Sequence, residues 1–460
     1  MPDQSDAQAD TANIPIMSHL QASGVGNAIP LYEGALELVT PKLRAVGTGR
    51  VYLSLQGTPS VSFDVSVKTP WLAEDSRCEI QIPGLSSVTR AILTQQNLKI
   101  GRGGCNCSVA GILDGPMDLI SRNDDGKPEA IGRVEFHVLN FLNFSGEGIF
   151  GKGGTSWGSR IEFSFGKWIV TLDQSANAEK YLKEAKSKRS NVITHVGILR
   201  RSDGKLFDIS DGQNALMELY WFLMFAAGSR CSIVCPIGWR HLKNPIWTQW
   251  SALICSPPTD SCNWFVGSLG KSCFNAAGDF HEVYIDEEKR QWLILACGIY
   301  VAANRNEVGI EFALANSQIL LEMLTWVALM EENSVMSEAA FGSLSAADKI
   351  RLLLFWLGVE CKIPNSLPSL RSAGGRIAGG NSDAPQVSTE IRNSIIHPTK
   401  SNRARRRDTS NSAVFEAWQW MLWIAELTLL KVIGYTGRYS SRIDKLESKA
   451  VPWSAEGRST

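Results

Sequence analysis

An arginine, an asparagine and a histidine lie close together in the segment 391–398, whose sequence is IRNSIIHP. The guanidinium of Arg392 can bind two oxygens of a phosphate with parallel hydrogen bonds. The imidazole of His397 can accept or donate a proton near neutral pH. Together with the amide of Asn393, these groups predict a site that clamps a phosphate and moves a proton without needing a metal ion.

The spacing of the three residues suits the end of a helix. On an ideal helix, Arg392, Asn393 and His397 span an arc of about 140°, while Ile391 and Ile395 point the other way into a core. Such a set suits cleavage of RNA by a neighbouring 2'-hydroxyl: Arg392 would stabilise charge in the transition state, His397 would act as base or acid, and Asn393 would orient the histidine or the phosphate. Because one histidine does not readily serve both ends of an in-line displacement, we expect a homodimer.

The order of an arginine, a polar residue, three variable residues and a histidine resembles the motif of HEPN domains. The resemblance covers roughly residues 311–438, including the predicted helices on both sides of the motif and the long loop before it. It implies a helical bundle of the kind found in prokaryotic toxins and anti-phage defence effectors, with a metal-independent endoribonuclease site at a dimer interface. These implied roles extend only to Arg392, Asn393 and His397.

A cluster of basic residues follows the motif, with no acidic residue before Asp408. The cluster consists of Lys400, Arg403, Arg405, Arg406 and Arg407. It could follow an RNA backbone beside the site, and a solvated loop of like charges explains it equally well. The tryptophans of the next predicted helix, Trp418, Trp420 and Trp423, could stack on bases, but aromatic residues at helical spacing more often pack in a core or a dimer interface.

Other motifs in the chain are weaker. The stretch Gly146–Gly151 has the spelling of a dinucleotide-binding loop, but such a loop needs a helix after it, and a predicted strand at 161–165 follows instead. The closest cysteine pairs, at 105 and 107 and at 231 and 235, lack the two-residue gap of zinc knuckles. We therefore expect no metal and no cofactor.

The remaining chain indicates how the motif is positioned. Between about residues 48 and 174 apolar residues alternate, as in Val61, Phe63, Val65 and Val67, which predicts an antiparallel sandwich or barrel-like sheet. Helices are expected at 178–189 and 213–227, with strands at 192–200 and 291–301.

Beyond Glu307 the apolar period becomes helical, and a first helix is predicted whose apolar side carries Phe312, Ile319, Leu320, Met323, Leu324 and Val327. A helix capped by Ser345 with Asp348 and ending at Gly358 is expected, followed by a long loop from 363 to 385, a helix ending at His397 before Pro398, and a helix from 412 to 433. Four helices of this kind predict a small bundle.

The fold class is therefore expected to be α+β multidomain, with an N-terminal β-rich, sandwich-like region, an α+β middle region and a C-terminal all-α helical bundle. The expected parts are a disordered tail at 1–14, a β-rich domain at 15–174, an α+β region continuing it at 175–308, a HEPN-like bundle at 309–440 and a C-terminal tail at 441–460.

The composition is that of a soluble protein, because 46 basic residues balance 46 acidic ones and 44% of the residues are hydrophobic. The first 13 residues lack the apolar stretch of a secretory signal. The apolar runs 215–228 and 413–435 are better explained as buried helices than as membrane spans. Ten cysteines in so long a chain suggest reduced thiols, so the expected location is the cytoplasm.

The favoured function is a metal-independent endoribonuclease that acts on RNA as a toxin or defence effector, with the β-rich region as the sensor or regulator of a phage-derived or protein trigger. Two alternatives remain open. The bundle could bind a nucleotide or a partner without cleavage, or it could mediate assembly while the tryptophan-rich middle region binds a protein or glycan. In the simplest alternative, Arg392 is a solvated helix residue and His397 a C-terminal cap.

Overall fold

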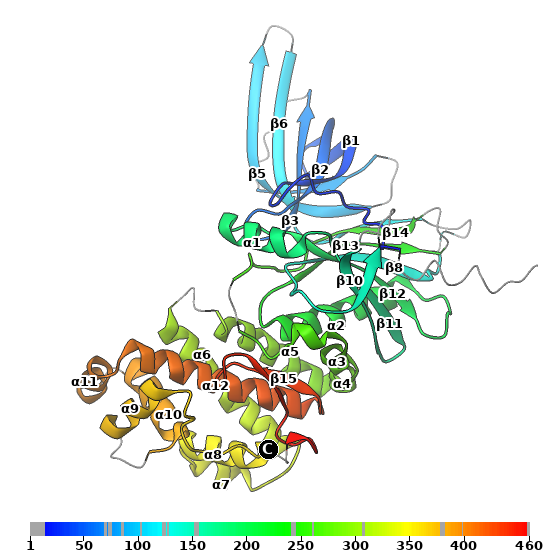
Figure 1. The fold of residues 1–460 in the computed structure, drawn as a ribbon. Helices are drawn as coiled ribbons and strands as arrows, with labels where there is room; N and C mark the ends of the chain where they lie inside the picture. Colours follow the sequence, from blue (N-terminus) through cyan, green and yellow to red (C-terminus); the bar gives the residue numbers. More distant parts are fainter. Residues whose placement is uncertain are drawn as a thin grey trace, which may run out of the picture. The chain divides into compact units, whose positions relative to one another are not determined.

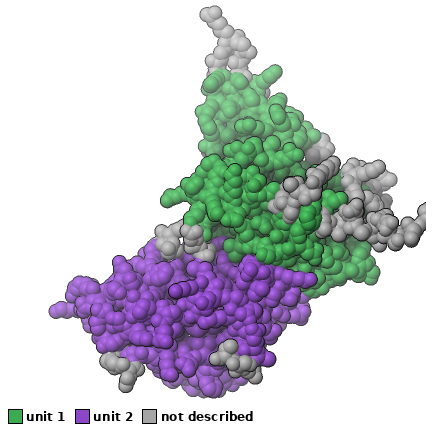
Figure 2. Space-filling model, in the orientation of Figure 1, with its two compact units in different colours: residues 1–220, 230–259 green, residues 221–229, 260–460 purple. Residues whose placement is uncertain are grey.

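The computed structural model describes most of residues 14–457. Inside this range it leaves out 69–70, 72–75, 84–86, 102–103, 122–125, 127, 151–155, 241–244, 260–261, 306–308, 378–381 and 398. Residues 1–13, which make up nearly all of the expected disordered tail, also lie outside the described residues. The chain forms two compact units: unit 1 comprises residues 1–220 and 230–259, and unit 2 comprises 221–229 and 260–460 (Figure 2).

The first part of unit 1 is a closed antiparallel barrel with the strand order β1-β2-β3-β6-β5-β4. Its strands are β1 (Ile29–Val39), β2 (Arg44–Ser54), β3 (Ser60–Val67), β4 (Arg77–Gln81), β5 (Val88–Gly101) and β6 (Gly104–Leu113). The barrel closes where Leu38 of β1 pairs with Ile80 of β4. Gly49 permits a close approach of β2 to β3, since a Cβ at this position would lie 2.2 Å from the carbonyl oxygen of Asp64.

The second part of unit 1 is an eight-stranded antiparallel sheet with the order β7-β14-β13-β8-β12-β11-β10-β9 (Figure 1). Its strands are β7 (Met117–Ile120), β8 (Arg133–Leu139), β9 (Glu147–Phe150), β10 (Ser156–Phe165), β11 (Trp168–Gln174), β12 (Ile193–Arg201), β13 (Ser232–Trp239) and β14 (Pro245–Trp250). Consecutive residues of the central strands β8, β12 and β13 are buried, so both faces of the sheet are covered there. Two helices accompany the sheet, α1 (Ala178–Lys188) and α2 (Ile209–Ala227), and the boundary between the units falls within α2.

Unit 2 is mainly helical. Its elements are a 3-10 turn (Gly267–Leu269), α3 (Gly270–Phe274), α4 (Ala276–Tyr284), α5 (Glu287–Ala303), α6 (Ile310–Trp326), a π-helical turn (Val327–Glu331), α7 (Glu338–Ser343), α8 (Ala346–Leu357), α9 (Pro368–Ile377), α10 (Ala384–Ile396), α11 (Lys400–Asp408), α12 (Asn411–Val432), β15 (Arg438–Ser441) and β16 (Glu447–Ala450). Residues 417–430 of α12 are buried throughout, and α12 packs against α5, α6, α8, α9 and α10. Helix α12 is therefore the centre of this unit.

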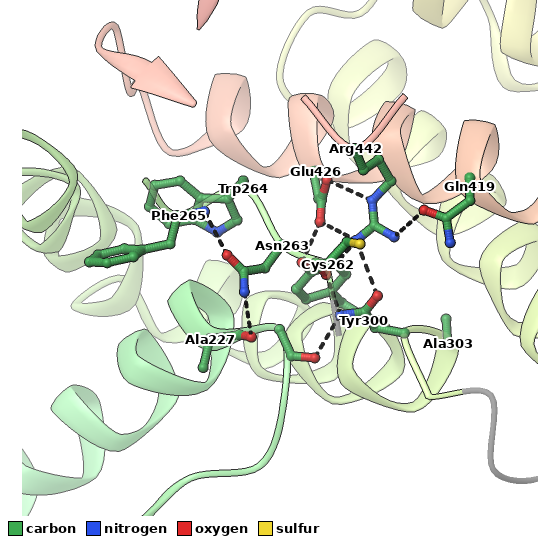
Figure 3. A network of polar contacts seen from close by, with 12 residues as sticks. Ala227, Cys262, Asn263, Trp264, Phe265, Tyr300, Ala303, Gln419, Glu426 and Arg442 are labelled. Atoms are coloured by element: carbon green, nitrogen blue, oxygen red, sulfur yellow. Dashed lines mark hydrogen bonds and ion pairs between the residues drawn. The ribbon is translucent and has the colours of Figure 1, made fainter. Parts of the chain in front are cut away.

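A fully buried ion pair joins the C-terminal hairpin to α12. Arg442 donates to Glu426 from Nε at 3.0 Å and from Nη2 at 2.5 Å, and it also donates to Gln419 at 3.3 Å (Figure 3). The hydroxyl of Tyr300 on α5 donates to the same carboxylate at 2.5 Å. Burial alone would lower the pKa of Arg442, but Glu426 more than offsets this and holds that pKa above its ordinary value. Residue 442, which we expected to lie in a C-terminal tail, is thus part of the core.

The expected fold class is confirmed as α+β multidomain, with a β-rich N-terminal region, mixed elements and a helical C-terminal region. The choice between a sandwich and a barrel is resolved as a closed barrel followed by a separate open sheet. The capping prediction is also confirmed, because Ser345 Oγ accepts the Asp348 N–H and Gly358 ends α8 with φ 75°.

Three local predictions are wrong. The run 291–301 belongs to helix α5, whose N-cap Asp286 accepts from the backbone N–H groups of Glu288 and Lys289. The expected loop 363–385 contains helix α9, and the basic segment after the motif is helix α11 rather than a loop. The apolar run of α5 is continuous and lacks a clear helical period, and α11 has no apolar face, so neither segment carries the pattern that indicates a helix.

One helical stretch, Ile310–Glu331, is long and apolar enough to cross a membrane, and 61% of its most apolar window is buried inside the fold. The core helix of a soluble protein has the same properties. The sequence predicted a helix here, but the runs that we weighed as membrane spans were 215–228 and 413–435.

Candidate nucleic-acid interface

Helix α10 carries the predicted motif and is fixed at its N-terminal end. Asp383 caps the helix by accepting the N–H of Gln386 at 3.0 Å. The same carboxylate accepts two hydrogen bonds from Arg351 of α8, at 2.7 Å from Nε and 3.0 Å from Nη2. Ile391 and Ser394 face the core and are buried, so the opposite face of α10 is left for Arg392, Asn393 and the helix end.

Arg392 is half-buried and already engaged. Its Nη1 donates to Oδ1 of Asn393 at 3.1 Å, so Asn393 helps to orient the arginine, a contact that was not part of its predicted role with the histidine or the phosphate. Its Nε is enclosed, with no hydrogen-bond partner among the described residues. A phosphate clamp that uses Nε would therefore require the side chain to turn, whereas the terminal guanidinium nitrogens need no such change.

His397 lies just beyond α10 in an extended conformation and caps the helix through its backbone. Its N–H donates to the carbonyl of Asn393 at 3.0 Å, and its own carbonyl accepts from Nδ2 of Asn402 at 2.9 Å. The residue is exposed, and among the described residues no hydrogen bond or ion pair of its imidazole is found. The three motif residues are thus neighbours, but among the described residues no side-chain hydrogen bond joins His397 to the other two.

Helix α11 follows almost at once. Thr399 caps it by accepting the Asn402 N–H at 3.2 Å, and none of its nine residues is buried. The cations of its last turn, Arg405, Arg406 and Arg407, lie where the helix dipole favours positive charge.

Two glutamates hold α11 against the rest of unit 2. Glu390 of α10 accepts from Arg405 at 2.5 Å, and Glu311 of α6 accepts from Arg406 at 2.8 Å. The hydrogen bond from Arg406 holds the pKa of Glu311 below its ordinary value. The predicted basic cluster therefore divides into two anchored arginines and three exposed cations, Lys400, Arg403 and Arg407.

A hollow of about 590 Å³ lies between α9 and α11. Ala373, Arg376, Arg405 and Asp408 line it, so two guanidinium groups and one carboxylate face the same space. Its volume falls in the range of about 300–1,000 Å³ that is usual for small-ligand sites. Arg376 was not among the residues that we expected, because it lies on a helix that the sequence did not predict.

We name the surface formed by Arg392, Asn393, His397 and helix α11 the α10–α11 surface. The sequence identified its cations but missed Glu390 and Glu311, which position them. No local signal could have paired Glu311 with Arg406, because 95 residues separate them. The three tryptophans of α12 do not contribute to this surface, since Trp418, Trp420 and Trp423 are all buried, which confirms the core interpretation.

Two protein families match this chain. Residues 126–261 match the YopA central domain, and residues 286–452 match the YopA C-terminal domain. A protein of Bacillus subtilis strain 168, described as SPbeta prophage-derived uncharacterized protein YopA, is 28% identical over 347 residues that cover 73% of this chain and 75% of the relative. No solved structure matches the chain.

These matches correct the predicted family. The C-terminal region resembles the YopA C-terminal domain, and no HEPN family is found, so the HEPN assignment is wrong. The motif misled because a fixed spacing of one arginine and one histidine on a helix is a loose pattern. Any role of Arg392, Asn393 and His397 now depends on the chemistry and placement of the residues themselves.

Proposed function

We propose that unit 2 binds RNA through the α10–α11 surface and cleaves it there without a metal ion, in the cytoplasm. The observation that carries this proposal is α11 itself, a helix of nine residues with five cations and no buried side chain. An isolated helix of that length is marginal in water, and neighbouring like charges weaken it further. Its ion pairs with Glu390 and Glu311 hold it in place, leaving Lys400, Arg403 and Arg407 exposed beside the motif.

Such a surface suits a phosphate backbone. Cations on one side of a short helix neutralise successive phosphates, and this contact carries most of the affinity for nucleic acid. The hollow lined by Arg376 and Arg405 adds a place for one nucleotide beside the helix. Since the whole chain has no net charge, the attraction must come from this local cluster.

The proposed reaction uses the 2'-hydroxyl of the RNA as its nucleophile. His397 accepts the proton of that hydroxyl. The 2'-oxygen then forms a bond to phosphorus, and the bond from phosphorus to the 5'-oxygen breaks. The products are a 2',3'-cyclic phosphate and a 5'-hydroxyl end, whose oxygen takes up a proton. Arg392 binds the non-bridging oxygens and stabilises their charge in the transition state.

A second acid is needed to protonate the leaving oxygen, and we propose that a second copy of the chain supplies it. Unit 2 exposes large apolar side chains that suit such a contact: Phe312 (67% exposed) and Ile319 (48%) stand seven positions apart on α6. Sedimentation tests this part alone. A chain that cleaves RNA as a strict monomer would refute the shared site.

One observation favours a non-catalytic alternative, in which the surface binds nucleotide or protein only. Arg392 is paired with Asn393, and among the described residues no side-chain hydrogen bond joins His397 to either residue. A surface of this kind would retain RNA without cutting it.

We further propose that the chain acts as a toxin or defence effector, with unit 1 as the sensor of a phage-derived or protein trigger. The support is indirect: the relative in Bacillus subtilis is described as prophage-derived.

The test is incubation of the full chain with fluorescently labelled single-stranded RNA in EDTA. The variants are Arg392→Ala and His397→Ala, with Arg290→Ala and His281→Ala as matched controls elsewhere in unit 2. We expect each site variant to reduce cleavage by about 100-fold or more, as is typical for loss of an acid–base or transition-state group. The controls should cleave like the parent chain.

Cleavage that is equal in all four variants would refute the proposed residues, and cleavage that requires added metal would refute the mechanism. RNA retention without cleavage by the parent chain would establish the binding alternative. Neither retention nor cleavage would refute both functions of the α10–α11 surface.

A further inference from the structure

Unit 1 contains a pocket that is unrelated to the α10–α11 surface. It lies among the barrel, the open sheet and helix α2, and has a volume of about 520 Å³. Its size falls within the range usual for small-molecule sites, which favour barrel mouths and places where several elements meet. We propose that this pocket binds a small uncharged ligand with a largely apolar body and an amide-like hydrogen-bonding group.

The walls of the pocket are apolar and well packed. Val61 of β3, Leu113 of β6, Leu216 of α2 and Ile233 of β13 line it, and all four are buried side chains. Met217 of α2 also lines it and is 38% exposed. A methionine at a rim adapts its shape to different ligands because its side chain is unbranched and flexible.

A small set of polar groups converges on one side. Oδ1 of Asp118 accepts from Nε1 of buried Trp247 at 2.7 Å and from Nε2 of Gln249 at 2.9 Å. Nε2 of Gln213 lies 3.5 Å from the same oxygen. Asp118 itself does not line the pocket, whereas Gln213 and Gln249 do. The side-chain nitrogens of Gln213 and Gln249 therefore face the carboxylate of Asp118, which orients both amides before any ligand binds.

The orientation assigns different roles to the two amides. Oε1 of Gln249 accepts from Oγ of Ser251 at 3.0 Å, so both the oxygen and the nitrogen of this amide already have hydrogen-bond partners. For Oε1 of Gln213 no partner is found among the described residues, and the residue is only half-buried. Gln213 thus offers a carbonyl acceptor to a ligand N–H, the arrangement that typically fixes a ligand's orientation in a mostly apolar site.

Strand β13 has a bulge at the residues beside the pocket. Val234 pairs with His137 and Ile237 with Glu135, so two residues of β13, Cys235 and Pro236, stand opposite a single residue of β8. Cys235 has φ 45°, which is uncommon for a residue other than glycine. Pro236 lines the pocket. Bulges of this kind interrupt the pairing of strands beside binding sites and redirect side chains there.

The charge of the ligand follows from the lining. None of the described residues that line the pocket is charged. A carboxylate that left water for this space would meet no counter-charge and would lie near the carboxylate of Asp118, which is strongly unfavourable. An uncharged ligand avoids this penalty, so the pocket should discriminate against carboxylates of the same shape.

The test uses the full chain and the uncharged fluorescent probe N-phenyl-1-naphthylamine. We expect saturable binding at one site per chain. Ala252→Phe, which fills the pocket, should weaken binding at least tenfold, and Ala35→Phe on β1, outside the pocket, should not. Competition then compares two molecules of one shape: 1-naphthamide should displace the probe at concentrations at least tenfold lower than 1-naphthoate.

Should Ala252→Phe fail to fold, Met217→Trp at the exposed rim provides a second blocking variant, with circular dichroism as the check of folding. Gln213→Leu should raise the concentration of 1-naphthamide that is needed to displace the probe, and should have less effect on displacement by 1-methylnaphthalene, which has the same rings but no N–H group. Equal probe binding by the parent chain and folded blocking variants would overturn the proposal, as would equal displacement by the amide and the carboxylate. Because RNA does not enter this assay, its outcome is independent of the function proposed for unit 2.

Discussion

The two units differ in the polar side chains that they enclose completely, although unit 1 also holds a largely buried ion pair, Arg160 with Asp173. Unit 1 encloses histidines that are kept neutral, whereas unit 2 encloses a guanidinium and a carboxylate that neutralise each other (Figure 3). The candidate binding sites of the two units also differ in charge. The described residues that line the pocket of unit 1 are uncharged, whereas helix α11 of unit 2 is cationic. A buried group without a counter-charge must be neutral, but a buried pair can keep its charge.

In unit 1 the two buried histidines lie on adjacent strands of the open sheet. His195 is packed by Phe141 and Phe144, and Nδ1 contacts the hydroxyl of Thr194 at 3.0 Å. Burial lowers its pKa to about 3. His137 contacts Oγ of Ser18 at 2.8 Å, and burial with the neighbouring His19 lowers its pKa well below the ordinary value.

In unit 2 the buried pair has satisfied partners on every side. Besides Glu426, Arg442 donates to Oδ1 of Asn304 at 3.1 Å and to the carbonyl of Cys262 at 2.9 Å. Burial, together with the charge of Glu426, raises the pKa of Tyr300 well above its ordinary value, so its hydroxyl remains a donor. The comparison shows that the arginines of this unit have different roles: buried Arg442 holds the core, Arg405 and Arg406 anchor α11 through Glu390 and Glu311, and Arg407 is exposed.

The largest effect is expected from breaking the buried pair. Arg442→Ala leaves Glu426 charged in the core and should destabilise unit 2 by about 3–5 kcal/mol. Hydrogen exchange of α12 peptides, resolved by mass spectrometry, measures the loss in unit 2 separately from unit 1.

Two variants control this prediction. Arg438→Ala on the neighbouring strand removes a partly exposed ion pair with Glu456 and two hydrogen bonds to Ser448, and should cost less, about 1–2 kcal/mol. Replacing both charges, as Arg442→Met with Glu426→Leu, should be less destabilising than the single change. Equal losses of stability for Arg442→Ala and Arg438→Ala would mean that the pair is not structural.

The second effect concerns pH and unit 1. His195 has a pKa of about 3 in the folded chain and about 6.5 when unfolded, so its stabilising contribution is complete above pH 6.5 and is lost as the pH falls toward 3. The slope is about 1.4 kcal/mol per pH unit, or roughly 2 kcal/mol between pH 6.5 and 5. Hydrogen exchange of the β8 and β12 peptides across this range measures it.

His195→Phe fills the same apolar site without a titrating group and should flatten the slope by the contribution of one histidine, leaving that of His137. A slope unchanged in this variant would show that acid destabilises unit 1 through other groups.

The third effect concerns the affinity of the α10–α11 surface for RNA. Lys400→Glu with Arg407→Glu should weaken binding of single-stranded RNA by about tenfold or more, and the slope of log affinity against log salt should become shallower by about 0.7 for each phosphate that is no longer neutralised. Fluorescence anisotropy at several salt concentrations measures both quantities. The control variant, Lys271→Glu with Lys445→Glu, changes the net charge by the same amount outside α10 and α11. An equal loss of RNA affinity in this control would mean that the overall charge of the protein, and not the α10–α11 surface, attracts RNA.

The smallest expected effect concerns the contribution of the exposed His397 side chain to the stability of the fold. His397→Ala should change the free energy of unfolding by less than about 0.5 kcal/mol, because the imidazole is exposed and only the backbone caps α10. A urea titration of the variant beside the parent chain measures the difference. A destabilisation above about 1 kcal/mol would reveal a packing role for His397 and would undermine the use of this variant to test cleavage.

Local features of the fold followed from the sequence wherever neighbouring residues decide the structure. The alternation of Val61, Phe63, Val65 and Val67 predicted a strand, and Ser345 with Gly358 marked both ends of α8. Helix α5 was mistaken for a strand because its apolar run is continuous and lacks a clear period. Helix α11 was missed because it has no apolar face, so its helical state depends on glutamates elsewhere in the fold.

The sequence by itself determined the fold class, the ends of several helices and the cluster of cations beside an arginine, an asparagine and a histidine, because capping, periodicity and charge act over a few residues. Only the tertiary structure decided that the sheet of β1–β6 closes into a barrel, that Arg442 meets Glu426, and that a pocket free of charge lies against α2. These features need contacts between distant segments, whose partners are chosen by packing and burial and leave no local mark in the chain.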